Sequence, residues 1–201
     1  MRCLVFALLL PVASVAQDLQ IQFHFPDSAQ AEVDEALLQT PNVTQAYELD
    51  IDGDGWTERL LLSFTPREVI PQHASLNNFV AFTHEAFQER IPDRVISSIA
   101  VDVEANPLDR AGLPFAAYGF FRPTPEGTPP TCDSAALFFE SDGGFWTLSW
   151  NAPRGWLRGD LGGVFGLIRT MEIRRPEPAY ATIQANPEPV SFDASELAVI
   201  R

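Results

Sequence analysis

The apolar positions of this chain follow a mostly two-residue period, which predicts β-strands. Near the start, Leu19, Ile21, Phe23 and Phe25 alternate with polar residues until Pro26. This alternation is typical of a strand with one buried face. The same period predicts a strand over residues 96–103, and apolar runs between turn residues predict others over 46–49, 59–64, 114–121, 135–140, 145–150 and 171–173.

One segment switches clearly to a helical period. Apolar residues between positions 76 and 91 recur every three or four residues, and Ser75 stands where an N-cap would. We therefore expect a helix over residues 75–90. His84 and Glu85 lie off its apolar stripe, so we expect them to face water.

Two further helices are predicted from weaker patterns. Residues 29–38 have helical composition, and residues 155–170 carry an apolar stripe that five glycines interrupt. Those glycines disfavour an isolated helix, so tertiary packing has to hold it. From Pro176 onward the chain is rich in Pro and Glu, and we expect residues 176–201 to form an extended strap. The order of elements predicts one α+β domain over residues 17–175, with an antiparallel sheet and flanking helices.

The first residues have the pattern of a secretory signal. A positive start is followed by an unbroken apolar run over residues 3–10 and by small residues at 14 and 16. We predict a signal peptide over residues 1–16, cleaved after Ala16, and a secreted or periplasmic protein. The apolar run is too short for a stable membrane span. The mature chain would then hold Cys132 alone, which we expect to be buried.

Charge narrows the classes of function. The formal net charge is −14, with thirteen cationic side chains that are all Arg and no Lys. Nucleic acid and anionic membrane surfaces are therefore disfavoured as partners. The absence of Lys excludes a Schiff-base lysine, a phosphate-binding Gly-Lys-Ser/Thr loop and a Ser-Lys dyad. The three His residues show no metalloprotease spacing, and no Gly-x-Ser-x-Gly elbow occurs.

One stretch has metal-ligand spacing. Acidic residues stand at the first, third, fifth and ninth positions from residue 50, and Gly53 and Gly55 allow a tight turn. The twelfth position, where an EF-hand needs an acidic residue, is Leu61. Flanking strands instead predict a β-hairpin turn that resembles the short calcium loops of integrin-type propeller repeats. The candidate Ca²⁺ ligands are the side chains of Asp50, Asp52, Asp54 and Glu58 and the carbonyl of Trp56. The alternative is a plain polar turn, since Asp and Gly are also common in hairpin turns.

The second half of the chain resembles a known family. The run from Ala135 to Pro153, AALFFESDGGFWTLSWNAP, followed by a helix and a short strand, is similar to the closing hairpin and helix of PsbP/Mog1/DcrB-like domains. The resemblance covers residues 74–173 and is one of pattern, without an invariant motif. It implies an antiparallel sheet flanked by helices and a binding or accessory role. No functional residue carries over from it.

These observations favour a secreted or periplasmic binding or accessory protein without enzymatic activity, whose protein or small-molecule ligand is unknown. One alternative is a secreted hydrolase that uses Asp102, Glu104 and Asp109. Another is an immunity or inhibitor protein that binds a basic partner through its acidic surface. Neighbouring aromatic residues in the strands, such as Phe120 and Phe121, must point to opposite faces of the sheet. We expect both faces to be covered; an uncovered face would be a ligand surface.

Overall fold

The computed structural model describes residues 18–50, 57–69, 75–101, 104–123, 131–151 and 167–176. The strands are β1 (Gln20–Phe23), β2 (Glu32–Val33), β3 (Val43–Leu49), β4 (Glu58–Pro66), β5 (Val95–Ile99), β6 (Phe115–Arg122), β7 (Thr131–Glu140), β8 (Gly144–Asn151) and β9 (Met171–Arg174). The α-helices are α1 (Leu76–Arg90) and α2 (Pro107–Arg110), and the 3-10 segments are η1 (Asp27–Ala29), η2 (Leu37–Gln39), η3 (Arg67–Val69) and η4 (Leu167–Thr170).

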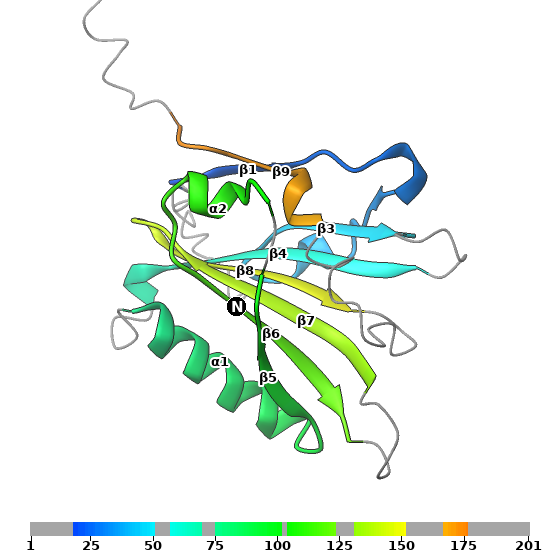
Figure 1. Cartoon of the computed structure of the whole chain (residues 1–201), viewed down its shortest axis with the longest axis vertical. Helices are drawn as coiled ribbons and strands as arrows, with labels where there is room; N and C mark the ends of the chain where they lie inside the picture. Colours follow the sequence, from blue (N-terminus) through cyan, green and yellow to red (C-terminus); the bar gives the residue numbers. More distant parts are fainter. Residues whose placement is uncertain are drawn as a thin grey trace, which may run out of the picture.

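These strands form two antiparallel sheets. Seven of them lie in the order β2-β3-β4-β8-β7-β6-β5, and β1 pairs with β9 in a separate two-stranded ribbon. Figure 1 shows the ribbon and α2 on one side of the large sheet and α1 on the other. The predicted antiparallel sheet is thus confirmed, and strands dominate the described residues, with α1 their one long helix.

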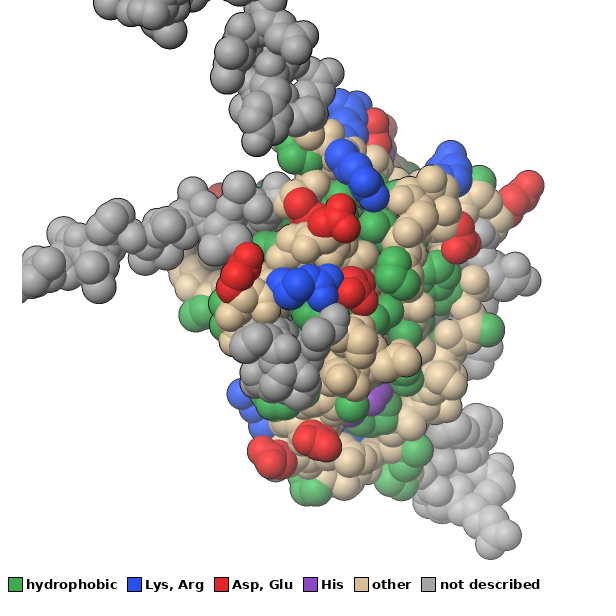
Figure 2. Space-filling view, turned by 90° about the vertical axis from the view of Figure 1, so that its left-hand side faces the viewer, with side chains coloured by type: hydrophobic (Ala, Val, Ile, Leu, Met, Phe, Trp, Pro, Cys, Tyr) green, Lys and Arg blue, Asp and Glu red, His purple; other side chains and the backbone are tan. Residues whose placement is uncertain are grey.

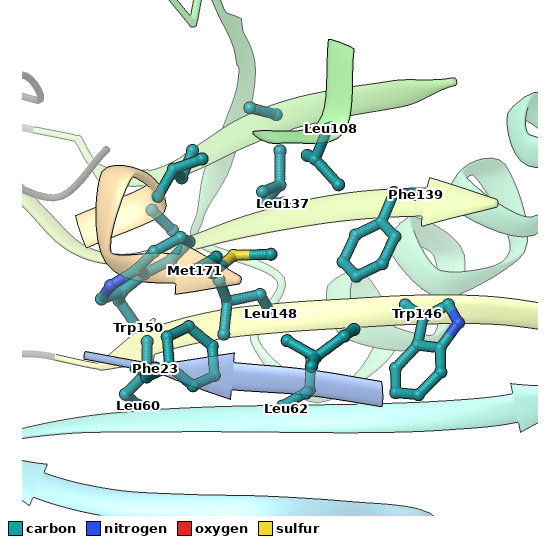
Figure 3. Close-up of a cluster of buried hydrophobic side chains, with 14 of the residues drawn as sticks. Phe23, Leu60, Leu62, Leu108, Leu137, Phe139, Trp146, Leu148, Trp150 and Met171 are labelled. Atoms are coloured by element: carbon teal, nitrogen blue, oxygen red, sulfur yellow. The ribbon is translucent and has the colours of Figure 1, made fainter. Parts of the chain in front are cut away.

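The larger part of the core lies between the sheet and the ribbon. In register across three strands, Leu62 lies beside Leu148, which lies beside Leu137. The rings of Phe139 and Trp146 stack nearby with centroids 5.9 Å apart. Figure 3 shows these side chains meeting Phe23 and Met171 of the ribbon. Alternation along β4, β7 and β8 therefore sends one apolar set toward the ribbon, as a half-buried strand pattern requires.

On the opposite face of the sheet, α1 covers a second apolar cluster. The ring of Phe79 stacks on Phe145 with centroids 4.7 Å apart and meets the edge of Phe138 at 6.1 Å. Phe138 and Phe139 thus point to opposite faces and are both almost fully buried. The expectation that both faces of the sheet are covered is confirmed where α1 and the ribbon lie.

The N-terminus of α1 is fixed by two kinds of cap. Ser75 Oγ accepts a hydrogen bond from Asn78 N at 3.3 Å, so the predicted N-cap is confirmed. Glu140, at the end of β7, accepts a second bond from Leu76 N at 3.0 Å. The other carboxylate oxygen of Glu140 accepts a bond from Arg67 Nη2 at 2.8 Å. A single carboxylate therefore joins the sheet, η3 and the positive end of the helix dipole.

Asp18 attaches the first described residues to the β7–β8 turn. Its carboxylate accepts hydrogen bonds from Ser141 Oγ at 2.8 Å and from Gly143 N at 2.9 Å. Ser141 Oγ in turn accepts a bond from the buried Trp146 Nε1 at 3.0 Å. These bonds hold the residue just ahead of β1 against the β7–β8 turn of the large sheet.

Several local predictions were wrong. Residues 29–38 form no helix; they hold the end of η1, β2 and the start of η2. The strand predicted over 96–103 ends at Ile99, and residues 107–110 form the short helix α2. The predicted signal peptide, most of the helix at 155–170 and nearly all of the C-terminal strap lie outside the described residues.

Candidate metal site and adjoining hollows

The predicted calcium turn joins β3 to β4. Leu49 and Glu58 are the last pair of the β3–β4 register, and Asp50 follows Leu49 directly. The predicted β-hairpin is therefore confirmed, and it places the first and ninth positions of the motif at the two ends of one turn. Asp52, Asp54 and Trp56 lie outside the described residues.

Glu58 is a buried acidic residue. Only 2 % of its surface is exposed, although it is the first residue of β4. Burying a carboxylate is costly unless hydrogen bonds, a counter-charge or a proton offsets it. At the other end of the turn, the Asp50 backbone N–H donates to Ala29 O at 2.9 Å, which fixes this end against η1.

A polar hollow of about 300 Å³ opens beside the turn. We call it the turn hollow; it is lined by Gln30, Glu32, Glu48, Leu49, Asp50 and Thr57. Glu32 and Glu48 are directly opposite in the β2–β3 register, where like charges repel each other. Arg59 Nη2 lies 3.0 Å from Glu48 Oε1, and its positive charge offsets part of that repulsion. Within the described ranges, no group of three or more His, Cys, Asp or Glu residues is arranged to hold a metal ion.

A second, larger hollow of about 630 Å³ adjoins the first. We call it the aromatic hollow; it is lined by Phe23, His24, Phe25, Pro26, Asp27, Gln30, Ala31 and Glu32. Gln30 and Glu32 line both hollows. Gln30 has a φ of 42°, in the left-handed region that residues other than Gly seldom adopt. At the right of Figure 1, the bend after β1 lies beside the end of the β3–β4 hairpin, which brings the two hollows together.

Phe23 and Phe25 line the aromatic hollow, and the ring of Tyr47 packs against both. Phe23 and Phe25 stack almost parallel with centroids 5.5 Å apart, and the edge of Tyr47 meets Phe25 at 5.0 Å. Phe23 is nearly buried, whereas Phe25 remains half-exposed. Burial also raises the pKa of Tyr47, so its hydroxyl stays protonated at neutral pH.

The outer face of the ribbon carries a small ionic group. Glu172 accepts a hydrogen bond from His24 Nε2 at 3.0 Å and one from Arg174 Nε at 2.7 Å. Both bonds lower the pKa of the exposed Glu172 carboxyl, and the bond from His24 has the larger effect. His24 is therefore occupied by an acidic neighbour at the edge of the aromatic hollow.

Two of the three carboxylates proposed for a hydrolase can be placed in the structure. Asp102 lies outside the described residues. Glu104 is exposed ahead of α2, and Asp109 is exposed within it. Neither lines the turn hollow or the aromatic hollow.

The expectation that His84 faces water was wrong. Its ring is half-buried between α1 and the sheet, 4.4 Å from the Tyr118 ring centroid and close to edge-on. The Nε2 atom is shielded from solvent and has no hydrogen-bond partner in the described part of the chain. Burial lowers the His84 pKa, because the surrounding rings of Phe120 and Phe138 solvate an imidazolium poorly. The burial of His84 could have been predicted from the sequence if the apolar stripe of the helix had been drawn wide enough to include position 84.

The expectation for Cys132 is confirmed. The residue is fully buried in β7, and its thiol donates to Ser134 O at 2.9 Å. A thiol in this position lacks the exposure that reactive cysteines need.

Comparison with protein-family models gives no match, and comparison with curated proteins finds no similar sequence. The described residues also include no helix with the length and apolar character to cross a membrane.

Proposed function

We propose that the protein is a secreted or periplasmic binding protein without enzymatic activity, in which Ca²⁺ bound at the β3–β4 turn stabilises the fold. The compartment rests on the signal sequence predicted at residues 1–16. The single α+β domain rests on the order of the predicted elements, and the accessory role rests on the pattern resemblance to PsbP/Mog1/DcrB-like domains. The calcium site rests on the spacing of four acidic residues in the turn.

One observation carries the calcium proposal. The Leu49 to Glu58 pairing brings the two ends of the acidic motif together, and Glu58, the ninth-position residue, is 2 % exposed. A hard cation prefers six to eight oxygen ligands, which carboxylates and a backbone carbonyl of a short turn supply. Calcium would also reduce the repulsion between Glu32 and Glu48 beside the turn. Its expected role is structural, since the turn joins two paired strands of the large sheet.

Calcium titration tests this proposal directly. Calorimetry should show binding to the wild type, and the melting temperature should rise when Ca²⁺ replaces a chelator. At about one hundred times the Kd, the stabilisation would be about 2.7 kcal/mol. For a chain of this size that corresponds to a rise of roughly 5–10 °C.

Paired variants separate the turn from general charge. Asp52→Asn with Asp54→Asn should abolish both the binding heat and the thermal shift. Asp93→Asn with Asp109→Asn removes two exposed acidic side chains elsewhere and should leave both unchanged. Absence of heat and of any thermal shift in the wild type would refute the calcium site.

A second candidate function is supported by the acidic surface around β2. Inhibition or neutralisation of a basic partner protein would use the carboxylates that line the two hollows. Salt dependence distinguishes this function, because charge-steered binding weakens as ionic strength rises.

A further inference from the structure

We propose that the aromatic hollow binds an arginine side chain presented by a basic segment of a partner protein. This inference rests on the proposed binding role and gives the partner a chemistry. It does not depend on calcium at the neighbouring turn.

The walls of the hollow suit a planar cation. The half-exposed ring of Phe25 is held by Phe23 on one side and by the edge of Tyr47, so its position is fixed before a ligand arrives. Aromatic faces attract cations, and guanidinium groups stack on them better than ammonium groups do. The rings themselves offer no oxygen ligand, so their side of the hollow suits a guanidinium better than a hard metal ion.

Charge selects a cation as well. Asp27 and Glu32 are exposed carboxylates of the hollow, and Glu48 continues the negative lining in the turn hollow. The described residues that line the two hollows include no Arg, and the chain has no Lys. The remaining basic group, His24, already donates to Glu172. A carboxylate beside an aromatic ring can accept the paired N–H groups of arginine while the ring contacts its face.

The opposite side of the molecule differs in its charge pattern. Figure 2 shows that side, where arginine side chains lie beside acidic ones and partly neutralise them. Beside the two hollows, Arg59 contacts Glu48, and Asp27 and Glu32 are exposed carboxylates. A cationic partner is therefore steered toward the bend after β1.

A protein segment fits better than a small free amine. The aromatic hollow continues into the turn hollow through Gln30 and Glu32, so several cationic side chains could be accommodated in succession. Among the described strands, β2 is an edge strand that pairs with β3 alone, and Val33 within it is 54 % exposed. An exposed strand edge offers backbone groups to an extended chain.

A capped hexa-arginine peptide is a suitable probe, with the uncharged isosteric hexa-citrulline peptide as its control. Binding is measured by calorimetry in a chelator, so that calcium does not contribute. We expect the arginine peptide to bind and the citrulline peptide to give no heat. Absence of binding by hexa-arginine would overturn the inference.

Two pairs of substitutions locate the binding. Asp27→Asn with Glu32→Gln should weaken the peptide about tenfold, because two charge-assisted contacts are lost. Glu85→Gln with Glu89→Gln removes the same charge from exposed positions on α1 and should change the affinity less than about twofold. Equal weakening by the two pairs would show attraction to net charge only and refute the hollow.

Phe25→Leu tests the aromatic wall. It should weaken binding about threefold or more while leaving the carboxylates in place; unchanged affinity would refute stacking on Phe25. If this variant does not fold, the exposed acidic pair above still decides the location. Calcium titration of the wild type separates the proposals: intact calcium binding without peptide binding overturns this inference alone, and the reverse overturns the calcium site alone.

Discussion

Replacing Glu140 should detach the first turn of α1 from the sheet. In Glu140→Gln, the charge that Arg67 Nη2 contacts at 2.8 Å disappears, and the bond from Leu76 N at 3.0 Å becomes one between neutral groups. A hydrogen bond to a charged group contributes about 1.5–3 kcal/mol, and the amide keeps part of it. The pair is partly exposed, with side chains 33 % and 22 % accessible, which reduces the loss further. We expect a total destabilisation of about 2 kcal/mol.

The assay has a global and a local part. Thermal unfolding should show a melting temperature about 4–8 °C lower for a chain of this size. Hydrogen exchange should show faster exchange for amides at the start of α1 than for those of β8. Glu172→Gln provides a matched control, because Glu172 also contacts an arginine but lies on the exposed ribbon. We expect that control to melt as the wild type does. Equal losses in the two variants would show that Glu140 acts as an ordinary surface ion pair.

Two further predictions concern His84 and Gly144. Because burial lowers the His84 pKa, the unfolded chain binds a proton that the folded chain excludes, so stability should be full above pH about 6.5 and fall as the pH drops below it. His84→Leu should flatten this part of the curve of melting temperature against pH; an unchanged slope would assign the pH dependence to other groups. A Cβ at Gly144 would collide with the Thr65 carbonyl oxygen in the next strand, so Gly144→Ala should cost about 2–3 kcal/mol in chemical denaturation. Gly112→Ala has open space but a φ of 67°, so it should cost only about 1–2 kcal/mol; an equal or smaller loss at Gly144 would contradict the collision.

Elements with strong local signals could be predicted from the sequence. The β3–β4 hairpin follows from Asp and Gly between two alternating runs, and α1 follows from Ser75 and its apolar period. The segment containing β2 has helix-favouring composition, but tertiary bonds overrule it: Asp34 N donates to Ala46 O, and Asp50 N donates to Ala29 O. The two hollows depend on these tertiary bonds. Because the bonded residues lie far apart in the sequence, no local pattern predicts the hollows.

His84 was misplaced for a related reason. The apolar stripe of α1 indicates which residues prefer burial, but the width of the contact depends on the partner surface. Here the rings of Tyr118, Phe120 and Phe138 extend under the neighbouring helical position. The candidate metal ligands could be proposed from spacing alone, whereas the arginine-binding hollow required knowing that β1, η1 and β2 fold against β3.

The pairing of β1 with β9 also bears on how the chain folds as the ribosome makes it. Gln20 pairs with Arg174, so the earliest described strand finds its partner only after almost all of the domain has been synthesised. Until then Ile21 and Phe23, both buried in the finished fold, remain uncovered on the nascent chain. Contacts of such long sequence separation form slowly and expose apolar surface to aggregation. The chain is therefore expected to need protection by a chaperone until β9 has emerged, and the ribbon would close the core as one of the last steps.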